Sequence, residues 1–423
     1  MLAARPFGSQ GAAAASLLKR SSPARRPTPT PQCLATAACA GTRISTPLTA
    51  VRHKSGPYGY TQAKSLVFSK FGEPSDVLKL HTHSISPTLP SSSVLLRALA
   101  APINPADVNT IQGTYGVKPS FSPLIGTSEP SAIPGNEGAF EVLQSSSPAF
   151  QRGDWAIPAR TGFGTWRTHA VAAADELIRV EREGIGRLQA ATVSVNPCSA
   201  YRMLRDYVAD PTPMREGDWF IQNGANSGVG RAAIQLGRLW GLRSINVVRA
   251  RPTPQETDAL RDDLRALGAT HVVTEDELLA RDFGERARAW TSDAGGSGIR
   301  LGLNCVGGKS AQALARALGR GGTLVTYGGM ARQPVALPTG LLIFGDVRFR
   351  GFWLSRWADA DPAARARTVA EILDLVREGR LRDVPVVEVP WDWDTEEREL
   401  KAAVQGALEG FRAGKGVFVF GDT

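Results

Sequence analysis

The chain has 423 residues, long enough for two or more domains, and a formal net charge of +9. Residues 1–54 hold eight Lys or Arg and no acidic residue, so the other 41 basic and 40 acidic residues nearly cancel. The basic excess therefore belongs to an N-terminal segment, which argues against a nucleic-acid-binding surface on the rest of the chain. No stretch is long and apolar enough to predict a membrane-spanning helix.

The N-terminal segment is rich in Arg, Ala, Ser, Thr and Pro, a composition typical of a mitochondrial transit peptide. Its apolar run at residues 12–18 is too short for a secretory signal. We therefore expect residues 1–54 to be a cleaved leader and the mature protein to lie in the mitochondrial matrix. A tail without a targeting role is the alternative. Only Cys198 and Cys305 lie beyond the leader, so no disulfide framework is expected.

Residues 61–195 are rich in Pro, Gly and Ser and contain short strand-like runs. Short strands broken by turn residues favour a partly open β-barrel or a sandwich. A similar apolar pattern near the C-terminus suggests that the end of the chain returns to this region. The runs lie at residues 65–68, 94–98, 155–158 and 417–420.

A glycine-rich stretch, residues 223–230, follows an apolar strand pattern at residues 219–221 and opens a helical pattern that Gly241 ends. Small residues let the backbone approach phosphate groups, and the first N–H groups of a helix attract anions. The glycines fall at positions 224, 228 and 230, so the spacing is not G-x-G-x-x-G. The surrounding strand and helix patterns nevertheless predict the pyrophosphate site of a dinucleotide.

The second strand of this unit, residues 244–248, ends in Arg249, Ala250 and Arg251. NAD-binding domains usually have an acidic residue here, which accepts hydrogen bonds from the ribose 2′-hydroxyl. Two guanidinium groups instead match a 2′-phosphate and favour NADPH. Two solvated arginines on a surface loop are the alternative.

Strand and helix patterns continue to alternate, which predicts parallel βαβ units in a doubly wound sheet. Ligands of such sheets bind beyond the carboxyl ends of the strands, where three later segments should border one crevice: residues 305–308, 327–330 and 352–355. The later strands are expected at residues 271–274, 299–305, 324–327 and 347–353. We therefore predict a dinucleotide-binding domain at residues 196–361, inserted into a catalytic domain made of residues 55–195 and 362–423.

Motifs spread from residue 61 to the C-terminus resemble those of the medium-chain dehydrogenase/reductase superfamily, and within it the mitochondrial 2-enoyl thioester reductases of fungi and animals. The resemblance implies an α/β fold, with a Rossmann-type doubly wound parallel sheet inserted into a β-rich, partly open GroES-like barrel. It also implies a homodimer formed through an edge of the nucleotide sheet, with residues 347–353 as the candidate strand. The matching motifs lie at residues 103–107, 111–115, 164–168, 195–204, 222–230, 304–309, 327–330 and 351–355.

The same resemblance implies a reaction in which NADPH gives a hydride to C3 of a trans-2-enoyl thioester and a proton reaches C2. The acyl group would be carried by coenzyme A or by an acyl carrier protein as partner. Tyr115 is then the expected proton donor or carbonyl-orienting group, because hydride addition places enolate charge on the thioester oxygen. Without the resemblance, a tyrosine in such a loop is expected to pack or to lie on the surface.

The resemblance further implies a set of cofactor contacts. Trp353 has core packing as its alternative role, and at Ala250 relatives often carry a polar or acidic residue. The implied contacts are Asn196 near the nicotinamide ribose; Asn226, Ser227, Gly228 and Val229 at the pyrophosphate; Arg249, Ala250 and Arg251 at the 2′-phosphate; Tyr327, Gly328, Gly329 and Met330 at the adenosine or ribose; Phe352, Trp353, Leu354 and Ser355 at the nicotinamide side; and Lys415.

Zinc alcohol dehydrogenases of the same superfamily need a catalytic Cys and a Gly-His-Glu motif. Here residues 135–138 read Gly-Asn-Glu-Gly, so Asn136 replaces the His ligand, and two cysteines cannot form a four-cysteine site. We therefore predict no metal. Two other functions remain open from the sequence: a zinc-independent quinone oxidoreductase, and a non-enzymatic NADPH-sensing or RNA-binding protein on the same scaffold.

Overall fold

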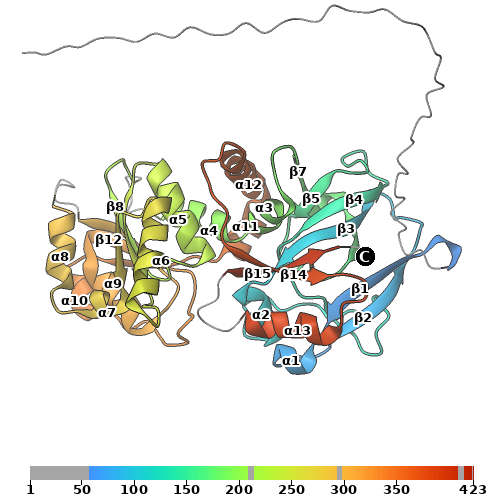
Figure 1. Cartoon of the computed structure of the whole chain (residues 1–423), viewed down its shortest axis with the longest axis horizontal. Helices are drawn as coiled ribbons and strands as arrows, with labels where there is room; N and C mark the ends of the chain where they lie inside the picture. The colour runs from blue at the N-terminus through green and yellow to red at the C-terminus, as the bar shows by residue number, and fades with distance from the viewer. Residues whose placement is uncertain (1–56, 208–213, 293–297, 408–413, 422) are drawn as a thin grey trace, which may run out of the picture. The chain divides into compact units, whose positions relative to one another are not determined.

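A computed structural model describes residues 57–207, 214–292, 298–407, 414–421 and 423 (Figure 1). The predicted leader lies outside these residues, and the described residues belong to one compact unit. None of the helices in the described part of the chain is long and apolar enough to cross a membrane.

One sheet has six parallel strands in the order β10-β9-β8-β11-β12-β13. The chain starts at the centre with β8, moves outward through β9 and β10, then crosses back to β11 and moves the other way. This order is that of a doubly wound dinucleotide-binding sheet, and its switch point lies between β8 and β11. The strands are β8 (Trp219–Gln222), β9 (Arg243–Val248), β10 (His271–Thr274), β11 (Ile299–Asn304), β12 (Leu318–Thr326) and β13 (Arg348–Gly351).

Helices cover both faces of this sheet, as the side chains of β8 show. Successive residues of a strand point to opposite faces, and Phe220 packs in one buried cluster with Leu236 while Ile221 packs in another with Leu314. These partners belong to different helices, so each face is closed by its own layer. The helices here are α4 (Asn196–Asp206), α5 (Gly228–Leu239), α6 (Pro254–Leu267), α7 (Glu275–Leu279), α8 (Phe283–Trp290), α9 (Gly308–Ala317) and α10 (Thr339–Ile343).

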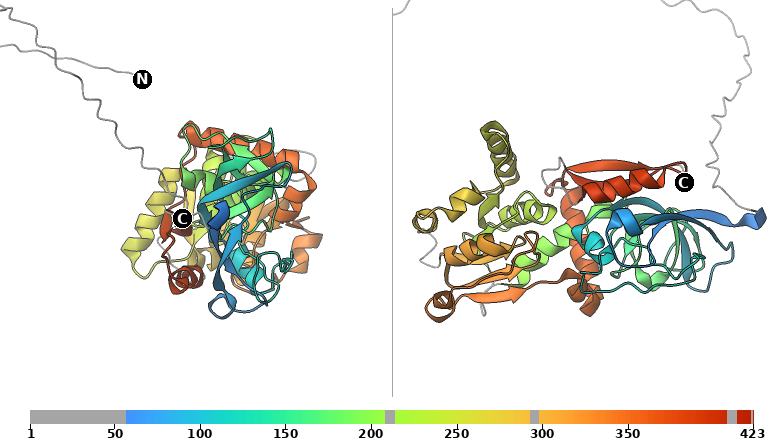
Figure 2. Two further views of the ribbon diagram at one scale, coloured as in Figure 1. Left: turned by 90° about the vertical axis from the view of Figure 1, so that its right-hand side faces the viewer. Right: turned by 90° about the horizontal axis from the view of Figure 1, so that it is seen from below.

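The second large sheet brings the two ends of the described chain together. Strand β15 pairs antiparallel with β3, with Val417 opposite Pro102, and Figure 2 shows the red C-terminal segments lying along the blue and green strands. Trp391, Phe418 and Trp166 pack edge to face in its core. The sheet order is β14 (Val386–Trp391), β15 (Lys415–Phe420), β3 (Ser93–Pro102), β4 (Ala139–Ser145), β5 (Trp155–Pro158) and β7 (Leu177–Val180), with β6 (His169–Ala173) paired to β3.

The remaining elements connect or cover these sheets. Strands β1 (Thr61–Val67) and β2 (Lys79–Ile85) form a separate antiparallel pair. Asp361 caps α12, where its side chain accepts a hydrogen bond from the Ala364 N–H at 2.9 Å, as the Asp-Pro pair predicts. The other helices are α1 (Pro74–Val77), α2 (Pro105–Ile111), α3 (Arg187–Thr192), α11 (Leu354–Ala360), α12 (Pro362–Arg377) and α13 (Glu397–Gly406), with 3₁₀ turns at Pro57–Gly59 and Ala174–Glu176.

The predicted α/β fold is confirmed, and several strand boundaries differ from the prediction. Strand β13 ends at Gly351 and not at residue 353, because α11 begins at Leu354. Strand β11 ends at Asn304, one residue early. Strand β12 begins at Leu318, which pairs with Ile299. The glycines that follow Leu318 resemble a turn in the sequence, so the predicted strand begins later. The division into a catalytic and a dinucleotide-binding domain stays a prediction.

Candidate functional site

The glycine-rich loop joins β8 to α5 in a conformation that only glycine allows at some of its positions. Ser227 caps the helix, and its hydroxyl accepts a hydrogen bond from the Gly230 N–H at 3.1 Å. A Cβ atom on Gly230 would lie 2.5 Å from the Ala225 carbonyl oxygen. The loop and the helix can therefore pack this closely only because residue 230 is glycine. The first N–H groups of a helix have no partner within it, so the start of α5 fits a bound pyrophosphate.

The loops after the central strands are tied together beneath this helix end. The buried Asn223 side chain donates to the Asn304 side chain at 2.8 Å and accepts from the Cys305 N–H at 2.8 Å. The Tyr327 N–H donates to the Asn304 carbonyl at 2.9 Å, and the Met330 N–H to the Cys305 carbonyl at 2.9 Å. The structure thus brings segments 223–230, 305–308 and 327–330 together at the carboxyl edge of the sheet.

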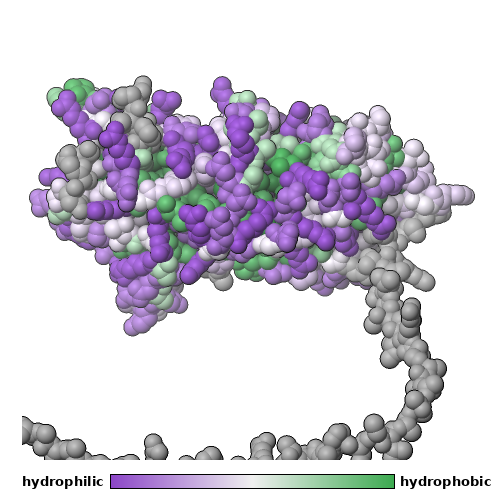
Figure 3. All heavy atoms as spheres, turned by 90° about the horizontal axis from the view of Figure 1, so that it is seen from above, coloured by the Kyte–Doolittle hydropathy of each residue, from purple (hydrophilic) through white to green (hydrophobic). Residues whose placement is uncertain are grey.

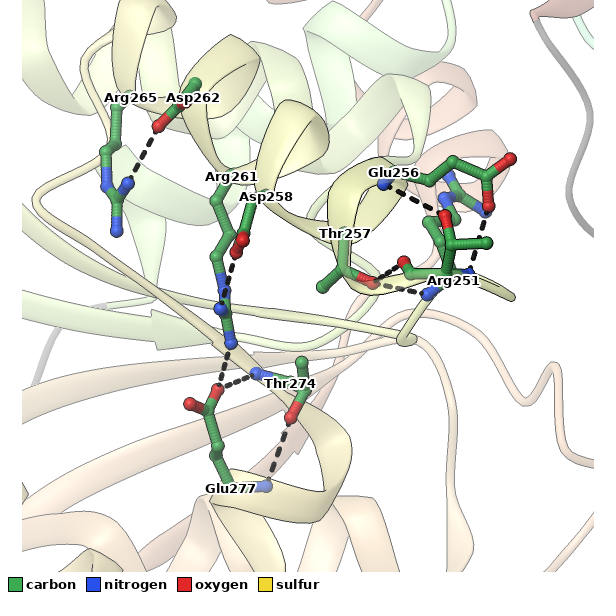
Figure 4. A network of polar contacts seen from close by, with 10 residues as sticks. Arg251, Glu256, Thr257, Asp258, Arg261, Asp262, Arg265, Thr274 and Glu277 are labelled. Carbon is green, nitrogen blue, oxygen red and sulfur yellow. Dashed lines mark hydrogen bonds and ion pairs between the residues drawn. The ribbon is translucent and has the colours of Figure 1, made fainter.

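The two arginines predicted for the 2′-phosphate follow β9 at the same edge. Arg249 and Ala250 are exposed and Arg251 is half-buried. The Arg251 N–H donates to the Thr257 hydroxyl at 2.9 Å, so this segment is fixed to the first turn of α6 (Figure 4). The Ala225 N–H donates to the carbonyl of Val247 in β9 at 3.1 Å, so the arginine segment adjoins the glycine-rich loop.

Tyr115 lies in a short loop after α2 and meets residues more than 230 positions away. Its phenol oxygen accepts a hydrogen bond from the Trp353 indole N–H at 3.0 Å and lies 3.0 Å from the Ser355 hydroxyl. The two rings are nearly perpendicular, with centroids 6.0 Å apart. Gly116 makes this contact possible, because a Cβ atom there would lie 2.8 Å from the Trp353 ring.

The segment after β13 does not present all of its predicted residues in the same way. Trp353 is 38 % exposed and contacts Tyr115, so its alternative role in the core does not hold. Phe352 is buried against Tyr207, and Ser355 is buried beneath Tyr115. Leu354 packs at the margin of the core.

A buried polar network lies behind the loop that replaces the zinc motif. The Asn104 amide donates to Glu137 at 3.0 Å and accepts from the Lys415 ammonium group. Asp107 accepts from the Asn104 N–H at 2.8 Å, and from the N–H and side-chain amide of Asn136 at 3.0 and 2.7 Å. Asn104, Asp107 and Glu137 are each at most 3 % exposed.

The charges of this network are shifted by their surroundings. Burial raises the pKa of Asp107 to about 6, against the hydrogen bonds from Asn104 and Asn136 that stabilise its charge. Burial also raises the pKa of Glu137 and lowers that of Lys415, although each group opposes the shift of the other. Opposite charges therefore meet at a site where Asp107 and Glu137 are buried and Lys415 is half-buried.

Asn196 is the first residue of α4 and lies against the glycine-rich helix. A Cβ atom on Gly228 would lie 3.0 Å from its side chain. The preceding N–H, that of Val195, donates to Glu137 at 2.8 Å. Asn196 and Lys415, two of the expected cofactor contacts, are therefore both linked to the buried network.

Four residues that organise this site were not predicted from the sequence: Asn104, Asp107, Glu137 and Arg231. Arg231 is 6 % exposed, and its guanidinium donates to Asn226 at 2.9 Å and to Asp263 at 2.7 Å. A positive charge in the first turn of a helix is unfavourable, because the helix dipole is positive at that end. An Arg at this position is the sequence signal that could have identified Arg231 as a site residue. The Glu of the Gly-Asn-Glu-Gly motif gives no signal of its role in the sequence, because its hydrogen-bond partners Asn104 and Val195 are distant in the chain.

The residues at that motif do not fit a zinc ion. The Asn136 side chain donates to Asp107 and accepts from the Gly162 N–H at 2.8 Å, so both ends of its amide are engaged. Cys198 is buried, and burial raises the pKa of its thiol to about 12. Within the described ranges no group of three or more His, Cys, Asp or Glu side chains could hold a metal. That the protein needs no metal remains a prediction.

Residues 228–370 match a family model described as zinc-binding dehydrogenase. A mitochondrial enoyl-acyl-carrier-protein reductase of Yarrowia lipolytica is 46 % identical over 324 residues, which cover 76 % of this chain and 82 % of that protein.

Two solved structures share the fold, each with a TM-score of 0.79, and each match covers 85 % of this chain and 99 % of the other. One, 37 % identical, is a complex of Etr1p with NADP and crotonyl-CoA. The other, 38 % identical, is a heterodimer of the mitochondrial 2-enoyl thioester reductases Etr1p and Etr2p from Candida tropicalis.

Proposed function

Since the chain belongs to the mitochondrial enoyl-acyl-carrier-protein reductases, we propose that it reduces trans-2-enoyl thioesters to saturated acyl thioesters with NADPH. The observation that carries this proposal is the meeting of Tyr115, Trp353 and Ser355 next to the carboxyl edge of the parallel sheet. The relatives are mitochondrial, and the leader composition of residues 1–54 agrees with that compartment.

The cofactor would be held mainly by the parallel sheet. The start of α5, with Asn226, Ser227, Gly228 and Val229, would bind the pyrophosphate, and Arg249 and Arg251 would bind the 2′-phosphate. The tight packing around Gly230 and the fixed Arg251 backbone support this assignment. The other proposed contacts are Asn196, Ala250, Tyr327, Gly328, Gly329, Met330, Phe352, Trp353, Leu354, Ser355 and Lys415.

The bound dinucleotide supplies the hydride that C3 of the substrate accepts. The electron pair of the double bond then moves towards the thioester, and negative charge develops on the thioester oxygen. A phenol that donates a hydrogen bond to this oxygen lowers the barrier, because the interaction is stronger in the transition state than in the bound substrate. Addition of a proton at C2 completes the reduction.

The chain prepares Tyr115 for this role. An indole N–H can only donate, so the phenol oxygen accepts from Trp353 and keeps its own O–H for a second partner. The Ser355 hydroxyl lies 3.0 Å from the phenol oxygen, at a distance where either group can donate, and the thioester oxygen would take its place as acceptor when substrate binds. We assign to Tyr115 both the orientation of the thioester carbonyl and the supply of the proton to C2.

An acyl carrier protein is the proposed macromolecular partner, because the relatives act on acyl groups carried by that protein. We also propose a homodimer in which β13, the edge strand of the parallel sheet, pairs with its copy. Leu342, Ile343 and Phe344, just before β13, are 48, 66 and 79 % exposed. Figure 3 shows a face on which apolar areas lie between hydrophilic side chains. Three neighbouring large apolar side chains this exposed mark an interaction surface, which a dimer would cover.

The test is NADPH oxidation by the purified protein with crotonyl-CoA, with longer enoyl thioesters on both carriers, and with quinones. We expect rapid oxidation with enoyl thioesters and slow oxidation with quinones. Oxidation by quinones alone would identify the protein as a quinone oxidoreductase. Cofactor binding without turnover of either substrate class would favour a non-enzymatic role.

A further inference from the structure

Glu137 is fully buried just before β4, between two segments proposed to contact the cofactor. Among the described residues, its carboxylate accepts hydrogen bonds from Asn104, Ser194 and Val195, and not from Tyr115 or the glycine-rich loop. A carboxylate buried only to fill space would be unfavourable, because an apolar side chain of similar volume does so without the cost of desolvating a charge. The contacts of Glu137 therefore point to a role.

One oxygen of Glu137 holds the start of α4. It accepts from the Val195 N–H at 2.8 Å and from the Ser194 hydroxyl at 3.4 Å. Val195 is the N-cap of α4, and the next residue, Asn196, packs against Gly228 of the proposed pyrophosphate site. This contact sets where Asn196 lies relative to the glycine-rich helix.

The other oxygen of Glu137 acts on Lys415 through Asn104. The Asn104 side chain must turn its NH₂ group to the carboxylate, and its carbonyl oxygen therefore faces the Lys415 ammonium group. Asp107 fixes Asn104 from behind by accepting its backbone N–H. The direction of each hydrogen bond along this path is thus set by the charge on Glu137.

We propose that Glu137 is a positioning residue that aligns Asn196 and Lys415 for NADPH without touching the cofactor. The inference rests on the proposed function, which assigns both residues to the cofactor site. It gives the Glu of the Gly-Asn-Glu-Gly loop a task in cofactor binding, at a place where the residues do not fit zinc.

The variant E137Q tests the path while it keeps the volume of the side chain. The Gln oxygen can still accept from Val195, but its NH₂ group then faces the NH₂ group of Asn104. If Asn104 rotates to relieve that clash, its NH₂ group faces the Lys415 ammonium group, so one donor–donor contact remains in either arrangement. We expect the Kd for NADPH, from fluorescence titration, to rise about tenfold, the worth of one charge-assisted hydrogen bond.

A second variant restores the pattern of donors and acceptors. In the double variant N104D/E137Q, the Gln NH₂ group donates to the new carboxylate at position 104, whose second oxygen accepts from Lys415, and the net charge of the site is unchanged. We expect its Kd for NADPH to return to within about threefold of the wild-type value, a recovery that coupled neighbours show in double-mutant cycles. The matched control is E141Q, which changes a Glu of β4 whose partner is Arg97, and it should leave this Kd unchanged.

The kinetic readout separates positioning from general damage. For E137Q we expect KM for NADPH to rise with a much smaller change in kcat, and a merely structural role would lower activity through loss of folded protein instead. An unchanged Kd in E137Q, or a double variant no better than E137Q, would overturn the proposal. If E137Q does not fold, the double variant decides alone, since it must bind NADPH nearly as well as the wild type. Wild-type protein that binds NADPH but reduces no enoyl thioester would refute the proposed function and leave this inference to its own test.

Discussion

The two sheets contribute to the site by different physical means. The parallel sheet offers main-chain groups at strand and helix ends. Glycine is needed there, as at Gly230, because a larger side chain would block the close approach of the main chain. The β-rich region offers charged side chains, namely the buried Asp107 and Glu137 and the half-buried Lys415. The first region should therefore be sensitive to added atoms, and the second to changes of charge and pH.

The largest expected effect follows from adding atoms to the main-chain site. In Gly230→Val, the new Cβ would overlap the Ala225 backbone, so the loop must move away from the helix. We expect NADPH affinity to fall by about 100-fold or more, because two or more contacts to phosphate are lost together. Isothermal titration with NADPH measures this change.

The control is Gly284→Ala in α8, where the nearest atom to a new Cβ is the end of the Arg288 side chain at 3.6 Å. It should bind NADPH as the wild type does. Wild-type affinity in Gly230→Val would show that the glycine-rich loop does not bind through its main chain.

Tyr115→Phe tests the residue at which the two regions meet. Removal of the hydroxyl leaves the ring on Trp353 but takes away the donor to the thioester oxygen. We expect kcat to fall by about tenfold or more, within the range for loss of one acid or oxyanion donor. The Kd for NADPH should stay unchanged, and turnover near that of the wild type would remove Tyr115 from the mechanism.

Arg249→Asp tests charge within the main-chain region. The new carboxylate would repel a 2′-phosphate and could accept hydrogen bonds from a ribose 2′-hydroxyl. We expect the ratio of kcat/KM for NADPH to that for NADH to fall by about tenfold or more, since each charge-assisted contact contributes about 1.5–3 kcal/mol. An unchanged ratio would place the 2′-phosphate elsewhere.

The last expected effect is on stability rather than on binding or turnover, and it comes from Asp107. Its pKa in the folded chain is raised from 3.8 to about 6, mainly by burial, so the folded chain holds this proton more tightly than the unfolded chain. The resulting stabilisation is complete below pH 4 and is lost as the pH rises through 6, a change of about 3 kcal/mol.

Asp107→Asn has no such titration. We expect the unfolding free energy of the wild type, minus that of this variant, to decrease between pH 4 and pH 7 in urea titrations. Glu137 raises and Lys415 lowers the pKa of Asp107, so the charges of both residues contribute to the measured pH dependence. Parallel pH profiles for the two proteins would show that Asp107 titrates alike in the folded and unfolded chains.

The main-chain region could be predicted from the sequence because its signals are local. A strand pattern, small residues and a helix pattern within some twenty residues predicted the β8–α5 turn. Tyr115 and Lys415 came from motif resemblance, and neither their spacing nor their surroundings would have marked them.

The buried network could not be predicted, because its partners are distant in the chain. Asn104 and Lys415 are 311 residues apart, and a Glu next to a missing His ligand gives no sign of its hydrogen-bond partners. Strand β12 was predicted too short for a similar reason: pairing with Ile299 stabilises a glycine-rich start that is unfavourable by itself. In both cases, the buried network and the start of β12, contacts between residues distant in the chain determine the structure.

The most direct test of the central claim is a crystal structure of the protein with NADP and an enoyl thioester. We predict that the Tyr115 phenol lies within hydrogen-bond distance of the thioester oxygen, about 2.7 Å, with the phosphates at the start of α5. A thioester oxygen bound by other groups, with Tyr115 out of reach of the substrate, would contradict this claim.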